Sequence, residues 1–164
     1  MGPAKTSAGL LMFRNQSEDL EVLLVHPGGP FFRKKDDAVW TIPKGEAAEG
    51  EDLLSRAVIE FEEELGIPAS AMAASQPPSW LDLGSVKQKG GKTVQAWGFE
   101  GDLPADFEVH SNTFEMEWPP RSGQKQEFPE IDRAEFFSME QARTKINEAQ
   151  VAFLDRLIAA VAKA

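Results

Sequence analysis

Apolar residues gather into short runs that polar, glycine-rich and proline-rich stretches separate. Residues 8–13 and 20–25 are almost continuously apolar and have the length of a strand, which is typical of strands buried on both faces. The polar residues 15–19 between them predict a turn. A shorter apolar run at residues 38–42, which Pro43 ends, predicts a third strand.

The clearest helical pattern covers residues 50–65. Apolar side chains recur there at intervals of three and four residues, which places them on one face of a helix. Gly66 and Pro68 follow this stretch and are typical of a helix end. The apolar face consists of Leu53, Leu54, Ala57, Phe61 and Leu65.

The second half of the chain alternates predicted strands and loops and ends in a helix. Strands around one internal helix, with a further helix at the end, indicate an α/β fold in which helices cover a mixed central sheet. The length fits a single domain over residues 1–164. The expected elements are strands at 79–86 and 93–100, one or two strands within 107–117, a loop at 118–128, a strand at 134–137, and helix from 139 to about 162 in one or two pieces.

Composition narrows the functional classes. The net charge of −10 argues against general nucleic-acid binding, because an acidic surface repels the phosphate backbone. It remains compatible with a nucleotide substrate, because a divalent cation can bridge protein carboxylates and phosphates. No apolar run approaches the ~18 residues that a bilayer-spanning helix needs, so no membrane partner is expected. The absence of cysteine excludes disulfides and thiolate chemistry and favours a cytoplasmic location.

Three glutamates, Glu60, Glu63 and Glu64, mark the candidate chemistry. At positions i, i+3 and i+4 of the predicted helix they fall within an arc of roughly 100°. Taken alone, this pattern is most often a solvated acidic face opposite an apolar stripe. It also suits a hard divalent cation, which prefers carboxylate oxygens. The glutamates by themselves leave both interpretations open.

The spacing around the glutamates is more specific. Gly45 is followed by five residues, Glu51, seven residues and then Ile-Glu-Phe-Glu-Glu-Glu-Leu-Gly-Ile. This stretch, residues 45–67, resembles the Nudix box, and every defined position matches except Ile59, where the family has arginine. The preceding Trp-Thr-Ile-Pro-Lys resembles the usual lead-in. The resemblance implies a Nudix-like α/β/α sandwich with a mixed central sheet.

The resemblance also implies a chemistry. In the family, the Nudix box forms a loop–helix–loop that binds Mg²⁺ or Mn²⁺, and the protein hydrolyses a phosphoanhydride bond in a nucleoside diphosphate linked to another group. The resemblance implies the same for this chain. By position, Glu60 and Glu64 are the implied metal ligands, with Glu63 a further ligand or the base. The carbonyl of Gly45 is implied as an additional ligand, and Glu51 as a structural or peripheral residue. In such a site a carboxylate takes the proton of an activated water.

Ile59 is the one departure from the box. The arginine that it replaces pairs with a box glutamate in the family and fixes its orientation, which isoleucine cannot do. Arg56 lies about one turn earlier on the predicted helix and projects between the directions of Glu60 and Glu63. We therefore expect Arg56 to be the substitute orienting cation; the alternative is a weakened or inactive family member.

Further site residues are expected outside the box. Family members supply a base or an extra metal ligand from a late loop, where Glu127 and Glu130 stand; Glu127 is favoured because it is closer to the Pro/Gly-rich stretch, and ordinary surface acids are the alternative. His26 lacks companion ligands for zinc, so a substrate contact is its candidate role. The expected substrate-binding residues are Lys44 beside the box, Arg33 on the loop before Trp40, Lys92 beside the Gly-Gly turn, and Trp118 as a stacking surface for a nucleobase.

Two functions stay open. The first is hydrolysis of a small nucleotide-type polyphosphate. A dinucleoside polyphosphate is favoured because residues 92–97 and the late loop resemble that branch of the family, with ADP-ribose, nucleoside triphosphates and diphosphoinositol phosphates as alternatives. The second is a non-catalytic Nudix-like module that binds a nucleotide as a sensor or regulator, which Ile59 supports. The three retained glutamates favour the hydrolase. The sequence defines neither the number of metals nor the oligomeric state.

Overall fold

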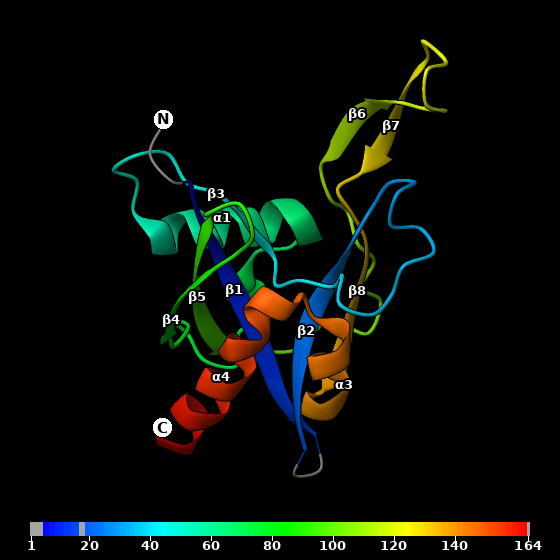
Figure 1. The fold of residues 1–164 in the computed structure, drawn as a ribbon. Helices are drawn as coiled ribbons and strands as arrows, with labels where there is room; N and C mark the ends of the chain where they lie inside the picture. The colour runs from blue at the N-terminus through cyan, green and yellow to red at the C-terminus, as the bar shows by residue number, and fades with distance from the viewer. Residues whose placement is uncertain (1–4, 17–18, 164) are drawn as a thin grey trace.

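The protein has a central sheet with helices on both faces, as the computed structural model of residues 5–16 and 19–163 shows (Figure 1). The turn predicted at residues 15–19 lies partly outside the described residues. The strands in the described part are β1 (Thr6–Gln16), β2 (Asp19–Pro27), β3 (Lys44–Glu46), β4 (Leu81–Lys87), β5 (Thr93–Glu100), β6 (Thr113–Glu117), β7 (Lys125–Pro129) and β8 (Ile131–Ser138). The helices are α1 (Leu53–Leu65), α2 (Ala69–Met72), α3 (Met139–Lys145), the short 3₁₀ helix η1 (Glu148–Gln150) and α4 (Val151–Lys163).

Strand β1 organises the sheet. It pairs in parallel with β5, from Thr6 opposite Thr93 to Phe13 opposite Glu100, and antiparallel with β2 and β3. The main sheet runs in the order β4-β5-β1-β2-β8, and β3 pairs with the first part of β1. One parallel pair among antiparallel pairs makes the sheet mixed, so this prediction from the sequence is confirmed. The hairpin β6–β7 forms a separate two-stranded sheet that extends away from the main one (Figure 1).

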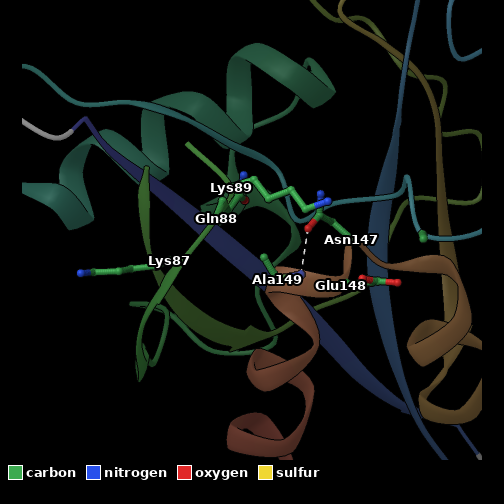
Figure 2. A pocket seen from close by; sticks show the side chains of 7 residues that line it. Lys87, Gln88, Lys89, Asn147, Glu148 and Ala149 are labelled. Carbon is green, nitrogen blue, oxygen red and sulfur yellow. Dashed lines mark hydrogen bonds between the residues drawn. The ribbon is translucent and has the colours of Figure 1, made fainter. Parts of the chain in front are cut away.

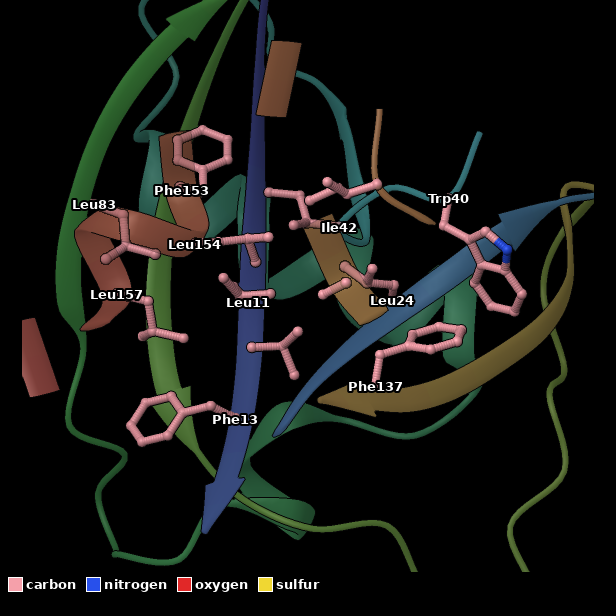
Figure 3. Packing of buried hydrophobic residues seen from close by; sticks show 14 of the residues in the cluster. Leu11, Phe13, Leu24, Trp40, Ile42, Leu83, Phe137, Phe153, Leu154 and Leu157 are labelled. Carbon is pink, nitrogen blue, oxygen red and sulfur yellow. The ribbon is translucent and has the colours of Figure 1, made fainter. Parts of the chain in front are cut away.

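The layers follow from the alternation of side chains along the buried strands. Successive residues of a strand point to opposite faces, so a strand that is apolar throughout supplies two cores. In β1, Leu10 and Met12 pack with the apolar face of α1, whereas Leu11 and Phe13 pack on the side of α3 and α4. Figure 3 shows this second core, where Phe153 of α4 and its neighbours cover the sheet. The result is a helix–sheet–helix sandwich.

Helix α1 begins later than the apolar pattern predicts. The structure starts it at Leu53, because Asp52 caps it by accepting a hydrogen bond from the Ser55 N–H at 3.0 Å. The helix ends as predicted at Gly66, which adopts a left-handed conformation (φ 83°) that glycine tolerates without strain. The helix that carries the three glutamates is therefore defined by side-chain or backbone caps at both ends.

Two sequence predictions about strands are wrong. Residues 38–42 do not form a strand: Trp40 and Thr41 make only isolated bridges to different partners, and the strand lies just beyond, at β3. The loop predicted at residues 118–128 is shorter, because β7 pairs with β6 over five residue pairs. The N–H of Trp118 donates to the carbonyl of Gln124 at 2.9 Å and narrows the connection between the two strands. Both differences arise from backbone pairing between residues that are far apart or not adjacent in the sequence, which a local pattern does not reveal.

The remaining expectations hold with modest changes of boundary. The strand within residues 107–117 is confined to β6, and the final helical region is divided into α3, η1 and α4. The single turn α2 was not expected from the sequence. In the described part of the chain, no helix combines the length and the apolar composition needed to cross a bilayer.

The cap of α1 yields a prediction about stability. Replacing Asp52 with alanine leaves the Ser55 N–H without its acceptor, and we expect unfolding to become easier by about 1 kcal/mol. Urea denaturation monitored by circular dichroism measures this change. The matched control is Asp52→Ser, because a serine side chain also caps helices; an equal loss in both variants would contradict the cap.

Candidate active site

Glu64 is the buried member of the glutamate cluster. Its side chain is 7% exposed, and one carboxylate oxygen accepts a hydrogen bond from the Lys44 N–H at 2.8 Å. Burial raises the pKa of Glu64 to about 8, against the lowering effect of Lys44, and the charges of Glu60 and Glu130 add to the rise. This hydrogen bond joins α1 to β3, the short strand that contains Gly45. The two parts of the motif are therefore in contact at the Glu64 carboxylate.

Glu60 lies directly over Gly45. A Cβ atom on Gly45 would stand 2.0 Å from the carboxylate carbon of Glu60, so a larger residue at this position would force the Glu60 carboxylate to move. Burial, followed by the charge of Glu63, raises the pKa of Glu60, while its contact with Arg56 works in the opposite direction. The structure thus brings the first and last parts of the motif into contact.

Arg56 connects two glutamates of the motif. Its Nε atom donates to both oxygens of Glu51 at 3.0 Å, and Nη2 donates to one of them at 2.7 Å. Its Nη1 atom donates to Glu60 at 3.2 Å. The hydrogen bonds from Arg56 lower the pKa of Glu51. Ile59, by contrast, is 42% exposed and takes no part in these contacts.

The late glutamates occupy different surroundings. The N–H of Glu130 donates to the carbonyl of Asn112 at 2.8 Å, and the N–H of Asn112 donates to the carbonyl of Glu63 at 3.2 Å. Burial and the charge of Glu63 raise the pKa of Glu130. Glu127 instead lies on the projecting hairpin and accepts a hydrogen bond from Thr113 Oγ1 at 2.6 Å. Of the two, Glu130 rather than the sequence-favoured Glu127 lies near Glu63 and the glutamate cluster.

The cluster fits a divalent cation by its chemistry. Carboxylate oxygens are the ligands that Mg²⁺ and Mn²⁺ prefer, and a cation would offset both the burial and the repulsion that raise the pKa of Glu60 and Glu130. Within residues 5–16 and 19–163, however, no three His, Asp or Glu side chains are gathered into a ready-made coordination group. A cation held by three of these carboxylates would therefore require side chains to rotate, which the exposed Glu63 allows.

The predicted substrate-binding residues are spread over three places. Lys92 pairs with Glu46 of β3 at 3.5 Å. Lys44 donates its backbone N–H to Glu64, and its positive charge opposes the rise in the pKa of that carboxyl group. Arg33 is exposed on the loop after β2. The ring of Trp118 stands edge-on to the ring of Phe31, with 5.9 Å between centroids. Phe31 is 62% exposed and was not singled out from the sequence.

His26 is excluded as a substrate contact. Its side chain is fully buried, with Nδ1 2.7 Å from a carboxylate oxygen of Asp132 and Nε2 2.7 Å from the Lys35 carbonyl. The ring also packs edge-on against Trp40. The residue therefore anchors the loop that follows β2 to the sheet.

A cavity of about 620 Å³ opens between the β4–β5 turn and η1 (Figure 2). Lys87, Gln88 and Lys89 line one side, and Asn147 to Ala149 line the other. Behind it the buried Gln150 donates to Gln88 at 3.0 Å and accepts from the N–H of Ile42 at 3.0 Å. Ile42 precedes Lys44 by two residues along the chain. The sequence carried no signal for Gln150, whose partners are far away along the chain.

The burial of Glu64 predicts a stability that depends on pH in the absence of divalent cations. The folded protein keeps the Glu64 proton up to about pH 8, while the unfolded chain releases it near its ordinary pKa, so unfolding releases a proton in between. The free energy of unfolding should therefore fall as the pH rises from about 5 to about 8. Urea denaturation with a chelator present measures it.

The control variants isolate Glu64. Glu64→Gln, which has no charge to bury, should show a much flatter dependence on pH, while Glu62→Gln on the exposed side of the same helix should follow the wild type. A Glu64→Gln variant with the wild-type slope would contradict the assignment of the pKa.

Comparison with known proteins agrees with this architecture. The model of the NUDIX domain family matches residues 3–157. Among solved structures, an Ap4A hydrolase of C. elegans in a binary complex superposes with a TM-score of 0.65 at 22% identity, covering 98% of this chain and 100% of that chain. The NUDIX domain of Shewanella oneidensis NrtR complexed with ADP ribose gives a TM-score of 0.65 at 12% identity, covering 98% and 90%.

A third similar structure is the MutT protein of Methanosarcina mazei, with a TM-score of 0.58 at 20% identity, covering 96% of this chain and 94% of that chain. No curated protein sequence matches the chain. These structural likenesses establish the fold, and the family model extends over nearly the whole chain. The chain belongs to the NUDIX domain family, which confirms the family that the sequence motif predicted.

Proposed function

We propose that the protein hydrolyses a phosphoanhydride bond in a nucleoside diphosphate-linked substrate and that the reaction depends on Mg²⁺ or Mn²⁺. The observation that carries this proposal is the buried carboxylate of Glu64, held by the Lys44 N–H beside the charges of Glu60 and Glu130. A carboxylate this poorly solvated gains strongly from a cation, because pairing offsets the cost of its burial.

The residues divide into three roles. Glu60 and Glu64, with Glu63 and the Gly45 carbonyl, are the groups that would hold the cation. When bound, the cation neutralises phosphate charge and lowers the pKa of a coordinated water. Glu130 is the proposed base, because burial and the charge of Glu63 raise its pKa toward the range in which a carboxylate accepts a proton effectively. Glu63 is the alternative base.

Residues in several parts of the described chain have the chemistry to bind a polyphosphate with an attached nucleoside. Lys44 and Lys92 place positive charge beside the acidic motif, where phosphates would lie. The cavity lined by Gln88 and Asn147 is large enough for a nucleoside and offers amide groups that can hydrogen bond to a base. The Phe31–Trp118 pair supplies an aromatic surface, and Arg33 is an exposed cation on the same loop as Phe31.

A dinucleoside polyphosphate is the substrate we favour. The similar C. elegans protein is an Ap4A hydrolase, and the polyphosphate of such a molecule would meet both lysines beside the motif. ADP-ribose is the next candidate, because the similar NrtR domain is complexed with it. The second candidate function, a nucleotide-binding sensor without turnover, is favoured by Ile59, which departs from the arginine of the box.

A substrate panel separates the hydrolase from the sensor. The protein is incubated with Mg²⁺ or Mn²⁺ and dinucleoside polyphosphates, ADP-ribose or nucleoside triphosphates, and the products are resolved by chromatography. We expect cleavage of at least one substrate and a loss of at least about 100-fold in Glu64→Gln, with Glu62→Gln close to wild type. Tight nucleotide binding without any product would establish the sensor instead.

The two late glutamates make a second test of the site. Glu130→Gln should lower kcat by about 100-fold or more, because the proposed base loses its ability to take a proton. Glu127→Gln is the matched control on the same segment, and its kcat should stay within about twofold of wild type, since its hydrogen bond to Thr113 lies on the hairpin. The reverse order of effects would restore Glu127 as the base.

A further inference from the structure

We infer that Arg56 is a positioning residue that has taken over the role vacated at Ile59, holding Glu60 in place for the cation from one helical turn earlier. The inference rests on the proposed function, because it assigns Glu60 to the cation site. It identifies a three-residue clamp, Glu51–Arg56–Glu60, as the device that sets the direction of the Glu60 carboxylate.

The first step is that Glu51 is itself fixed. Its Oε1 atom accepts a hydrogen bond from the Ala48 N–H at 2.9 Å, inside a turn that the Glu51 N–H closes on the Ala48 carbonyl at 3.1 Å. The loop before α1 therefore holds this carboxylate on one side. Its other side meets Arg56 through Nε and Nη2.

The second step is the geometry of the guanidinium. With Nε and Nη2 both engaged by Glu51, the plane of the group is set, and Nη1 is the donor left to face Glu60 at 3.2 Å. The three side chains are only 15–24% exposed, so water competes little for these contacts. A lysine would supply one point charge and could not set the same direction.

Without the contact to Arg56, the Glu60 carboxylate would lack its positively charged partner. This carboxylate is packed directly over Gly45, and it lies near the negative charges of Glu63 and Glu130. A cation would have to meet the Glu60 carboxylate within the cluster. Repulsion from Glu63 and Glu130 pushes the carboxylate out of that position. Arg56 supplies the opposing attraction through its Nη1 atom.

The position of Ile59 makes the inference testable by exchange. Positions 56 and 59 are three residues apart and lie about 60° from each other around the helix, so both belong to the same side of α1. Ile59 is 42% exposed, and an arginine can replace it without disturbing the core. An arginine moved from 56 to 59 should therefore recover the clamp.

The experiment measures Mn²⁺ affinity of the full chain by titration calorimetry, without substrate. Arg56→Ala should weaken Mn²⁺ binding by about 10-fold or more, Arg56→Lys should recover only part of the loss, and the double variant Arg56→Ala/Ile59→Arg should recover most of it. Arg143→Ala is the matched control, because Arg143 pairs with Asp155 outside the motif, and its affinity should equal that of the wild type.

Thermal unfolding without metal separates positioning from folding. Arg56→Ala and Arg56→Ala/Ile59→Arg should unfold at similar temperatures while differing in Mn²⁺ affinity; if Arg56→Ala does not fold, the comparison of Arg56→Lys with wild type replaces it. Unchanged Mn²⁺ affinity in Arg56→Ala, or no recovery in the double variant, overturns the inference. Wild-type Mn²⁺ binding with no product from any substrate overturns the proposed function alone.

Discussion

The hydrogen bond from the Lys44 N–H to the buried carboxylate of Glu64 is the contact on which the site depends. Removing a carboxylate from water costs several kcal/mol unless partners offset it, and one N–H offsets only part of that cost. The pKa of Glu64, about 8, reflects the part of the desolvation cost that the Lys44 N–H does not offset. A cation that binds here relieves this cost, so the same contact that joins α1 to β3 also prepares the site for positive charge.

The sheet makes this contact possible by holding β3 close to β1. A Cβ atom on Gly9 would stand 2.6 Å from the carbonyl oxygen of Pro43, so the close approach of the two strands requires glycine at that position. The N–H of Leu10 donates to the same carbonyl at 3.1 Å. On the other side, Ala57, Phe61 and Leu65 fix α1 against β1. Strand β1 therefore supports both β3 and α1, the two elements that carry the motif.

The sequence predicted those features that depend on neighbours along the chain. Helix α1, the buried strands β1 and β2, and β5 followed from apolar spacing, and the glutamates followed from their distances to Gly45 and Glu51. It missed what depends on distant partners. The pairing of β7 with β6 places Glu127 on a projecting hairpin and Glu130 at its base, and no local pattern distinguishes these two acids. The buried Gln150 and His26 are likewise defined by remote partners.

Arg56 shows that a site can keep the charge it needs even where a residue of the sequence motif is replaced. A box prescribes residue types at positions, whereas the site needs charge in a particular place, and a long side chain on a helix can reach one place from more than one position. Arg56 reaches both Glu51 and Glu60, the two carboxylates that stand on either side of it along the chain. Ile59 alone therefore does not argue for an inactive protein. A sensor that merely bound nucleotide would have no need of a guanidinium held by one carboxylate and aimed at another, and this arrangement favours the hydrolase.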